Sequence, residues 1–129
     1  MIYKIGLLIF RDKTFLINRK KGTSLFLLPG GKPENGETDI VCLGREIREE
    51  HDCEIIEDSL SYFGDFEDVS AEGNDIVHIK VYRGNIKGNP TPSSEIVEQK
   101  WFGKNDDVSI LSPIILNKIL PEIERKRLM

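Results

Sequence analysis

The stretch from Gly31 to Cys53 constrains this chain most, because it joins a glycine-rich loop to a segment dense in carboxylates. The loop, residues 30–36, holds three glycines and one proline, which interrupt regular structure. Beyond it, Ile40, Leu43 and Ile47 recur at the spacing of one apolar helix face. The stretch therefore predicts a loop that leads directly into an amphipathic helix.

The residues at both ends of this segment fit the ends of a helix. Thr38 is expected to be the N-cap, and Asp39 suits the positive end of the helix dipole. The helix is expected to end near His51 and Asp52, and an aspartate tolerates the left-handed exit conformation better than most residues, though less well than glycine.

Three glutamates of the predicted helix, Glu46, Glu49 and Glu50, lie at positions i, i+3 and i+4, with Arg45 and Arg48 beside them. This spacing brings the carboxylates onto one side of the helix within a turn, where they repel one another. A hard divalent cation such as Mg²⁺ relieves that repulsion, because it prefers carboxylate oxygens. The alternative interpretation is an ordinary solvated helix face.

The whole stretch resembles the 23-residue box of the Nudix hydrolases. The box positions matched here are Gly31, Glu37, Arg45, Glu46, Ile47, Glu49 and Glu50. The sequence departs from the box at its end, where Asp52 replaces the last glycine and Cys53 replaces an aliphatic residue. The preceding residues, Leu28-Pro29-Gly30, also resemble the family's approach to the box.

The order of expected elements is strands, helix, strands, helix, which indicates an α+β protein with one domain over residues 1–129. The resemblance implies the Nudix-type α/β/α sandwich, with a mixed β-sheet between helices. Strands are expected at residues 2–10, from Phe15 into the basic run 18–21, and at 25–28, 53–56, 60–66, 76–83 and 95–102, with loops at 68–75 and 84–94. A second helix is expected to begin at Ser112-Pro113, to continue through residues 114–120, and to be interrupted or kinked by Pro121.

The resemblance implies a set of metal ligands. Glu46, Glu49 and Glu50 are the expected ligands, with the carbonyl of Gly30 as a further one, and Mg²⁺ is the expected ion with Mn²⁺ as the alternative. Gly30 and Gly31 are also expected to contact substrate. Glu37 is expected to support the site, either through water to a metal or by holding Arg45, which would orient the carboxylates.

Other roles implied by the resemblance are less sharply placed. The general base is expected to be Glu49, Glu95 or Glu98, and the last two also fit ordinary surface charge on an edge strand. Arg19 is the candidate for contacting substrate phosphates, although its basic run also fits a solvated hairpin end. His51 and His78 are expected at the surface or at a helix end.

The implied reaction is hydrolysis of the pyrophosphate bond in a nucleoside diphosphate linked to another group. The short chain favours a (deoxy)nucleoside triphosphate, with ADP-ribose, a dinucleoside polyphosphate, or a nucleotide-sensing module without turnover as alternatives. Leu111 stands where related enzymes that act on oxidised guanine nucleotides often place a base-reading Asn, so that substrate is not favoured. Trp101 or Phe102 could stack on a base, although buried aromatic residues mostly belong to the core.

Charge and cysteine content limit the partners. The net charge of −4 argues against a general nucleic-acid-binding protein. Cys42 and Cys53 are expected to be free thiols, and the N-terminus lacks the features of a signal peptide, so a cytoplasmic protein is expected. No apolar run reaches the length of a membrane helix. A homodimer is the oligomer that similar proteins suggest.

Overall fold

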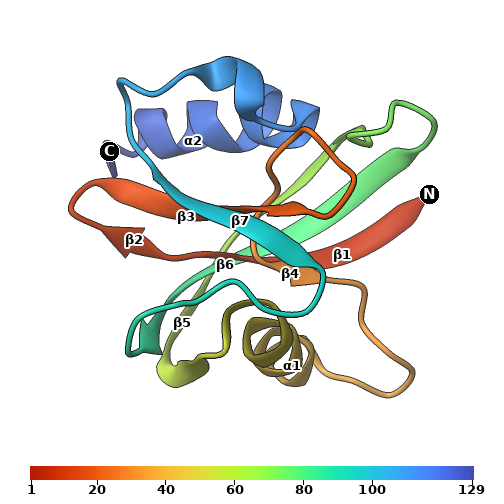
Figure 1. Cartoon of the computed structure of the whole chain (residues 1–129), viewed down its shortest axis with the longest axis vertical. Coiled ribbons are helices and arrows are strands. Elements are labelled where there is room, and N and C mark those ends of the chain that lie inside the picture. Colours follow the sequence, from red (N-terminus) through yellow and green to blue (C-terminus); the bar gives the residue numbers. More distant parts are fainter.

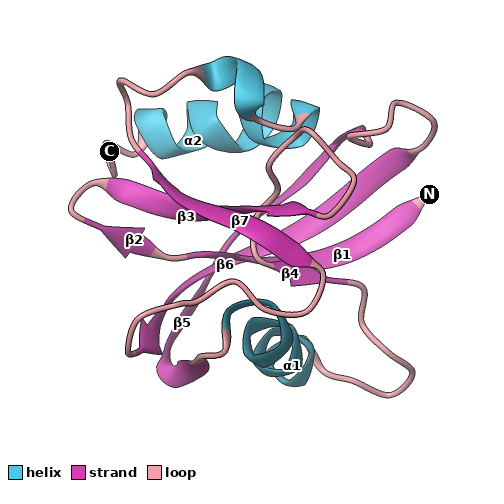
Figure 2. Ribbon diagram, in the orientation of Figure 1, coloured by secondary structure: helices cyan, strands magenta, loops and turns pink.

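Two β-sheets lie between two helical segments in the computed structural model, which describes residues 1–129 (Figure 1). The elements in chain order are β1 (Ile2–Leu8), β2 (Phe10–Arg11), β3 (Thr14–Lys20), β4 (Gly30–Gly31), α1 (Asp39–His51), β5 (Glu54–Val69), β6 (Ile76–Lys87), β7 (Ile96–Phe102), the 3₁₀ turn η1 (Val108–Ile110), the π-helical segment η2 (Ile115–Ile119) and α2 (Leu120–Arg125). Figure 2 shows α1 on one side of the strands and α2 on the other, so the predicted α/β/α sandwich is confirmed.

The strands divide between two sheets, a division that the sequence did not predict. The first sheet has the order β4-β1-β6-β5 and is mixed, because β1 runs parallel to β6 while the other pairs are antiparallel. The second sheet, β2-β3-β7, is antiparallel. The strand expected over residues 2–10 therefore ends at Leu8, since Phe10 pairs with Phe15 in the second sheet.

The hydrophobic core has two parts, one on each face of the first sheet. The smaller part joins Ile5 and Leu7 of β1 to Leu43 and Ile47 of α1. The larger part lies between the two sheets and the C-terminal helix, and includes Leu8, Phe15, Ile17, Val77, Ile79, Val81, Phe102, Ile115, Ile119 and Ile123. Each fully buried apolar side chain of this kind contributes about 1.5–3 kcal/mol, so both helices are held by packing on the sheets.

Both ends of α1 follow the sequence-based prediction. Thr38 Oγ1 accepts a hydrogen bond from the backbone N–H of Val41 at 3.3 Å, as an N-cap does. Asp52 takes the left-handed conformation, with φ 52° and ψ 42°. The predicted apolar face of the helix was wrong at one position, because the side chain of Ile40 is 42% exposed. Cys42 is buried in its place, so the helix packs on the sheet through Cys42, Leu43 and Ile47.

Several expected strand boundaries were wrong. Residues 25–28 form only isolated bridges, at Phe26 and Leu27, because Pro29 and the neighbouring turn leave too few residues for a paired strand. The two strands expected at 53–56 and 60–66 are one long strand, β5, which accommodates two register shifts against β6. Both β5 and β6 also extend into the segments expected to be loops, because each satisfies the other's backbone hydrogen bonds.

The C-terminal helix does not break at Pro121. It begins at Pro113 and passes through the π-helical segment η2, in which the N–H of Leu120 bonds to the carbonyl of Ile115. The helix then continues as α2, in which Pro121 lies just after the π-helical segment, so the altered hydrogen bonding coincides with the residue that lacks an N–H. None of the helices has both the length and the apolar character needed to cross a membrane.

Candidate active site

A narrow cavity opens between the first sheet, the end of β3 and the start of the C-terminal helix. Its walls come from β1 and β6 (Ile2, Lys4, Ile5, Val77, Ile79), from β3 and the segment that follows (Asn18, Lys20, Leu27, Leu28, Gly30, Gly31), from the β5–β6 turn (Val69, Ser70, Ala71, Glu72), from the C-terminal helix and the residue before it (Ser112, Ile114, Ile115, Ile119), and from Glu50 of α1. The cavity therefore joins a mostly apolar interior to the carboxylate-bearing helix.

Glu50 is the carboxylate of that helix that faces the cavity. Its side chain is only 3% exposed, and its Oε1 accepts a hydrogen bond from the backbone N–H of Gly30 at 3.0 Å. Burial raises the pKa of Glu50 to about 8, against the opposing effect of the Gly30 N–H, and the nearby charge of Glu46 adds to the increase. Glu50 makes no ion pair within 4.0 Å, so only a proton or an added cation would neutralise it.

Arg45 joins the glycine-rich loop to the helix. Its guanidinium holds Glu37 with two hydrogen bonds, Nε to Oε2 at 2.7 Å and Nη2 to Oε1 at 2.9 Å. Nη1 donates to Glu46 Oε1 at 2.7 Å and lies 3.4 Å from Glu49 Oε2, and Nη2 reaches the carbonyl of Lys32 at 3.2 Å. Hydrogen bonding to Arg45 lowers the pKa of Glu37 to about 2, so this pair stays ionised.

The loop leaves room for Glu46 only because residue 31 is a glycine. A Cβ on Gly31 would lie 2.7 Å from the carboxyl carbon of Glu46 and 2.8 Å from both of its oxygens. Burial raises the pKa of Glu46 although Arg45 donates to it. The carboxylate is therefore confined between the loop backbone and the guanidinium.

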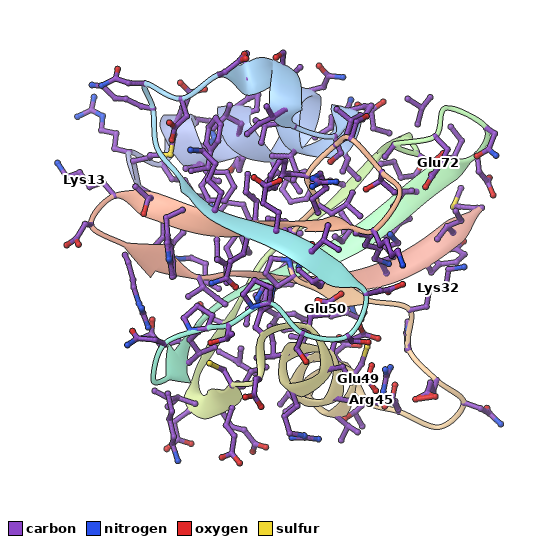
Figure 3. All side chains as sticks on the ribbon, viewed as in Figure 1. Lys13, Lys32, Arg45, Glu49, Glu50 and Glu72 are labelled. Carbon is purple, nitrogen blue, oxygen red and sulfur yellow. The ribbon has the colours of Figure 1, made fainter.

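Figure 3 shows Arg45 and Glu49 on α1, with Glu50 between the helix and the strands. No group of three or more His, Cys, Asp or Glu side chains is placed to hold a metal ion. The reason is visible in the contacts, because Arg45 lies between Glu46 and Glu49 while Glu50 faces the Gly30 N–H. The oxygens nevertheless fit Mg²⁺ or Mn²⁺ in kind, and the buried Glu50 lacks the positive charge that such an ion would supply.

The basic run presents Lys20, not Arg19, to the cavity. Arg19 donates to Glu98 Oε1 at 2.9 Å and to the carbonyl of Thr23 at 2.7 Å, and it is not part of the cavity wall. Lys20 lines the cavity, and its Nζ lies 3.3 Å from Glu95 Oε1. Strand alternation places Lys20 on the same face of β3 as Asn18 and Arg19 on the other face, but only the structure shows that the face of Asn18 is the enclosed one.

A chain of buried polar side chains behind the cavity was missed by the sequence reasoning. Asn18 Nδ2 donates to His51 Nε2 at 2.9 Å, and His51 Nδ1 donates to Gln99 Oε1 at 2.8 Å. Gln99 in turn donates to the carbonyl of Pro90 at 2.8 Å. His51 is the last residue of α1, which is one of the two positions expected for it, but its side chain is fully buried and does not lie at the surface. Nothing in the spacing of these residues indicates that the fold brings them together.

The aromatic pair in β7 does not reach the cavity. Phe102 is 1% exposed and packs in the core against Phe15, with ring centroids 5.6 Å apart. The guanidinium of Arg11 lies over Trp101, 5.0 Å from the ring centroid. Neither ring is placed to stack on a ligand in the cavity. His78, in contrast, lies on the first sheet between Asp65 and Glu67, away from the cavity wall.

Solved structures share this fold over almost the whole chain. The MutT protein from Methanosarcina mazei Go1 is 20% identical with a TM-score of 0.79, covering 98% of this chain and 95% of its own. A NUDIX hydrolase from Nitrosomonas europaea is 16% identical with a TM-score of 0.78, covering 97% and 89%. A bifunctional NMN adenylyltransferase/ADP ribose pyrophosphatase from Francisella tularensis, complexed with AMP and a Mn ion, is 19% identical with a TM-score of 0.66, covering 97% and 41%.

At these identities the likeness shows a common fold and no more. Among curated proteins, none matches this chain. The family is shown by a model of the NUDIX domain, which matches residues 3–111 and therefore most of the sequence. The chain belongs to the Nudix hydrolases, enzymes that act on phosphoanhydride bonds of nucleoside diphosphate-linked substrates and generally use divalent metal ions.

Proposed function

We propose that this protein hydrolyses (deoxy)nucleoside triphosphates with Mg²⁺, releasing the nucleoside monophosphate and pyrophosphate. The observation that carries the proposal is the position of Glu50, which belongs both to the carboxylate set of α1 and to the wall of the cavity. A nucleotide needs charge neutralisation at its phosphates and an apolar chamber for its base. Both environments meet at this residue, as is usual for small-molecule sites.

The pyrophosphate bridge resists attack by water because its oxygens carry negative charge. A bound divalent ion neutralises part of that charge and lowers the pKa of a bound water. Glu46, Glu49, Glu50 and the carbonyl of Gly30 would hold it. Arg45 orients Glu46 through its 2.7 Å hydrogen bond, while Glu37 fixes the guanidinium. Lys20 supplies positive charge for a phosphate at the edge of the cavity.

Glu49 is the proposed general base. It lies on the helix that carries the other two glutamates, and its side chain is 53% exposed, so water reaches it. Glu98 of β7 forms an ion pair with Arg19, and Glu95, just before β7, forms one with Lys20. Glu49→Gln is expected to reduce kcat strongly, whereas Glu98→Gln, whose partner Arg19 does not line the cavity, is the matched control that also removes one carboxylate.

ADP-ribose is the second candidate substrate. The Francisella tularensis protein that shares this fold is named as an ADP ribose pyrophosphatase and holds AMP and a Mn ion. Hydrolysis of ADP-ribose would release AMP and ribose 5-phosphate, so the products separate the two candidates. Dinucleoside polyphosphates give a third product pattern, and a sensing module would bind nucleotide without releasing any product.

The proposal is tested with the purified protein, Mg²⁺ or Mn²⁺, and a panel of nucleoside triphosphates, ADP-ribose and dinucleoside polyphosphates. Chromatography of the products identifies the bond that is broken. The proposal expects pyrophosphate and a monophosphate from at least one triphosphate, at a higher kcat/KM than for ADP-ribose. Release of AMP and ribose 5-phosphate alone would transfer the function to the second candidate.

A further inference from the structure

Lys4 is a cation without a partner in the wall of the cavity. It extends from β1, is half-buried, and forms no side-chain hydrogen bond and no ion pair within 4.0 Å. Burial lowers the pKa of Lys4, and the positive charge of Lys20 adds to this effect, while Glu72 and Glu50 act in the opposite direction without reaching it. The ammonium group therefore has no protein acceptor, and it is available to an acceptor atom of a ligand in the cavity.

The surroundings of Lys4 are mostly apolar. On the same face of the first sheet, Lys4 is paired in register with Ile79, and Ile2 and Val77 form the next pair. Ile115 and Ile119 of the C-terminal helix also line the cavity. A phosphate would be poorly solvated among these side chains, whereas a flat heterocycle would bury its faces against them.

Two further polar groups of the same cavity also lack partners. Asn18 Oδ1 and Ser112 Oγ are buried without any hydrogen bond, and each residue is only 1% exposed. The amide of Asn18 is oriented by the bond from its Nδ2 to His51, so its oxygen remains as an acceptor. An anion would be repelled by this oxygen. A ligand that suits the cavity must therefore present an acceptor to Lys4 and a donor to Asn18.

We propose that Lys4 and Asn18 read the edge of a keto nucleobase, so that the preferred substrates are nucleotides of 6-oxopurines or 4-oxopyrimidines. A lysine ammonium only donates, and the Asn18 oxygen only accepts. A keto base carries a ring carbonyl next to a ring N–H, which satisfies both groups. In the same orientation, an amino base presents an amino group to Lys4 and an unprotonated ring nitrogen to Asn18, so neither side chain finds its complement.

This inference rests on the proposed function for a nucleotide entering the cavity, and it is tested by substrates that differ only at this edge. Inosine and adenosine nucleotides form one matched pair, and uridine and cytidine nucleotides form the other. Binding of IMP, AMP, UMP and CMP in the presence of Mg²⁺ is measured by calorimetry. Hydrolysis of the four triphosphates is measured in parallel, as kcat/KM.

The wild-type protein is expected to prefer the keto member of at least one pair by about tenfold, the size of a hydrogen bond to a charged donor. Lys4→Met keeps the length and apolar stem of the side chain and should remove most of that preference. Lys118→Met removes an exposed lysine of the C-terminal helix and should leave the preference unchanged. Lys4→Arg, which retains a donor, should keep part of it.

Four results would overturn the inference. The wild-type protein could bind both members of both pairs equally, or prefer the amino members, or bind none of the four. Lys4→Met could lower the affinity for keto and amino nucleotides by the same factor, as loss of a phosphate contact would. Keto-selective binding of the monophosphates without hydrolysis of any triphosphate would instead contradict the proposed function and leave the reading of the base intact.

Discussion

The carboxylate of Glu50 accepts a hydrogen bond from the backbone N–H of Gly30, with 3.0 Å between Oε1 and N. This contact joins the last turn of α1 to β4, and β4 in turn pairs with β1 through Gly6 and Ile5. A buried carboxylate with one N–H partner and no ion pair is stable when protonated or when a cation binds. The contact therefore places a site for positive charge at the edge of the cavity.

The first prediction concerns stability without metal. Glu50 has a pKa of about 8 in the folded protein, against a usual value of 4.5, so the folded state keeps a proton that the unfolded state loses. This contribution to the free energy of unfolding is fully present below pH 4.5 and is lost as the pH rises through 8. It amounts to a few kcal/mol at most, at about 1.4 kcal/mol per pKa unit.

Urea denaturation with EDTA at several values between pH 5 and pH 8 measures this dependence. The free energy of unfolding of Glu50→Gln should fall less than that of the wild-type protein as the pH rises, and the difference between the two isolates Glu50 from the other titrating groups. Adding Mg²⁺ at pH 8 should stabilise the wild-type protein and not the variant. If the free energy of unfolding changed with pH by the same amount in both proteins, Glu50 would be ionised in the metal-free folded protein.

The second prediction concerns the space at Gly31. Gly31→Ala would place a Cβ 2.7 Å from the carboxyl carbon of Glu46 and should displace that carboxylate, lowering kcat by about tenfold or more. Gly44→Ala is the matched control, because its Cβ would have only the end of Arg48 nearby, at 3.7 Å. That control should stabilise α1 by up to about 1 kcal/mol and leave kcat unchanged. Equal kcat values for both variants would contradict the role of Glu46.

The third prediction concerns Arg45. Arg45→Lys keeps a positive charge but cannot hold Glu37 with two parallel hydrogen bonds. We expect activity or metal affinity to fall about 10- to 100-fold, the usual effect of losing a residue that orients metal ligands. Arg48→Lys, at an exposed position without an ion pair, should behave as the wild-type protein. Steady-state kinetics across a Mg²⁺ titration distinguishes weaker metal binding from a slower chemical step.

The sequence predicted the carboxylate helix well because its determinants are local. The Thr38 cap and the left-handed Asp52 both follow from residues at the ends of one helix. The helical spacing of Glu46, Glu49 and Glu50 did not show that Arg45 lies between the first two or that Glu50 faces Gly30. The contact between Glu50 and Gly30 spans twenty residues and depends on the pairing of β4 with β1, which has no signature in a two-residue strand.

The remaining features depend on distant pairing. Lys4, Asn18 and Ser112 come from β1, β3 and the start of the C-terminal helix, and only the packing of the two sheets brings them to one cavity. Strand alternation predicts that Lys20 and Arg19 lie on opposite faces of β3, but it does not predict which of these faces is enclosed. The burial of His51 likewise follows from β3 and β7 covering the end of α1.

The fourth prediction concerns this buried histidine. Burial lowers the pKa of His51, although its bond to Gln99 opposes the change, so the neutral form is favoured in the folded protein. This contribution to stability is present above the usual pKa of 6.5 and is lost as the pH falls below it. His51→Leu should remove that loss and also destabilise the protein by about 1–3 kcal/mol, because Asn18 and Gln99 lose their partners.

Urea denaturation at pH 7.5 and pH 5.5 measures both effects of His51→Leu. His78→Leu is the control, since His78 lies on the sheet surface between Asp65 and Glu67 and its pKa is raised through its hydrogen bonds to Glu67 and Asp65. The contribution of His78 to the free energy of unfolding should fall as the pH rises, whereas that of His51 falls as the pH decreases. If both substitutions changed the pH dependence of the free energy of unfolding in the same direction, a neutral, buried His51 would be ruled out.

The central claim is that Glu50 and its neighbours on α1 hold a divalent ion that enables phosphoanhydride hydrolysis. The most direct measurement is the rate of triphosphate hydrolysis against Mg²⁺ concentration for the wild-type protein, Glu50→Gln and the control Glu98→Gln. We expect Mg²⁺-dependent turnover that falls at least about 100-fold in Glu50→Gln and persists in Glu98→Gln, with all three proteins folded. Wild-type turnover by Glu50→Gln, at the same Mg²⁺ dependence, would contradict the claim.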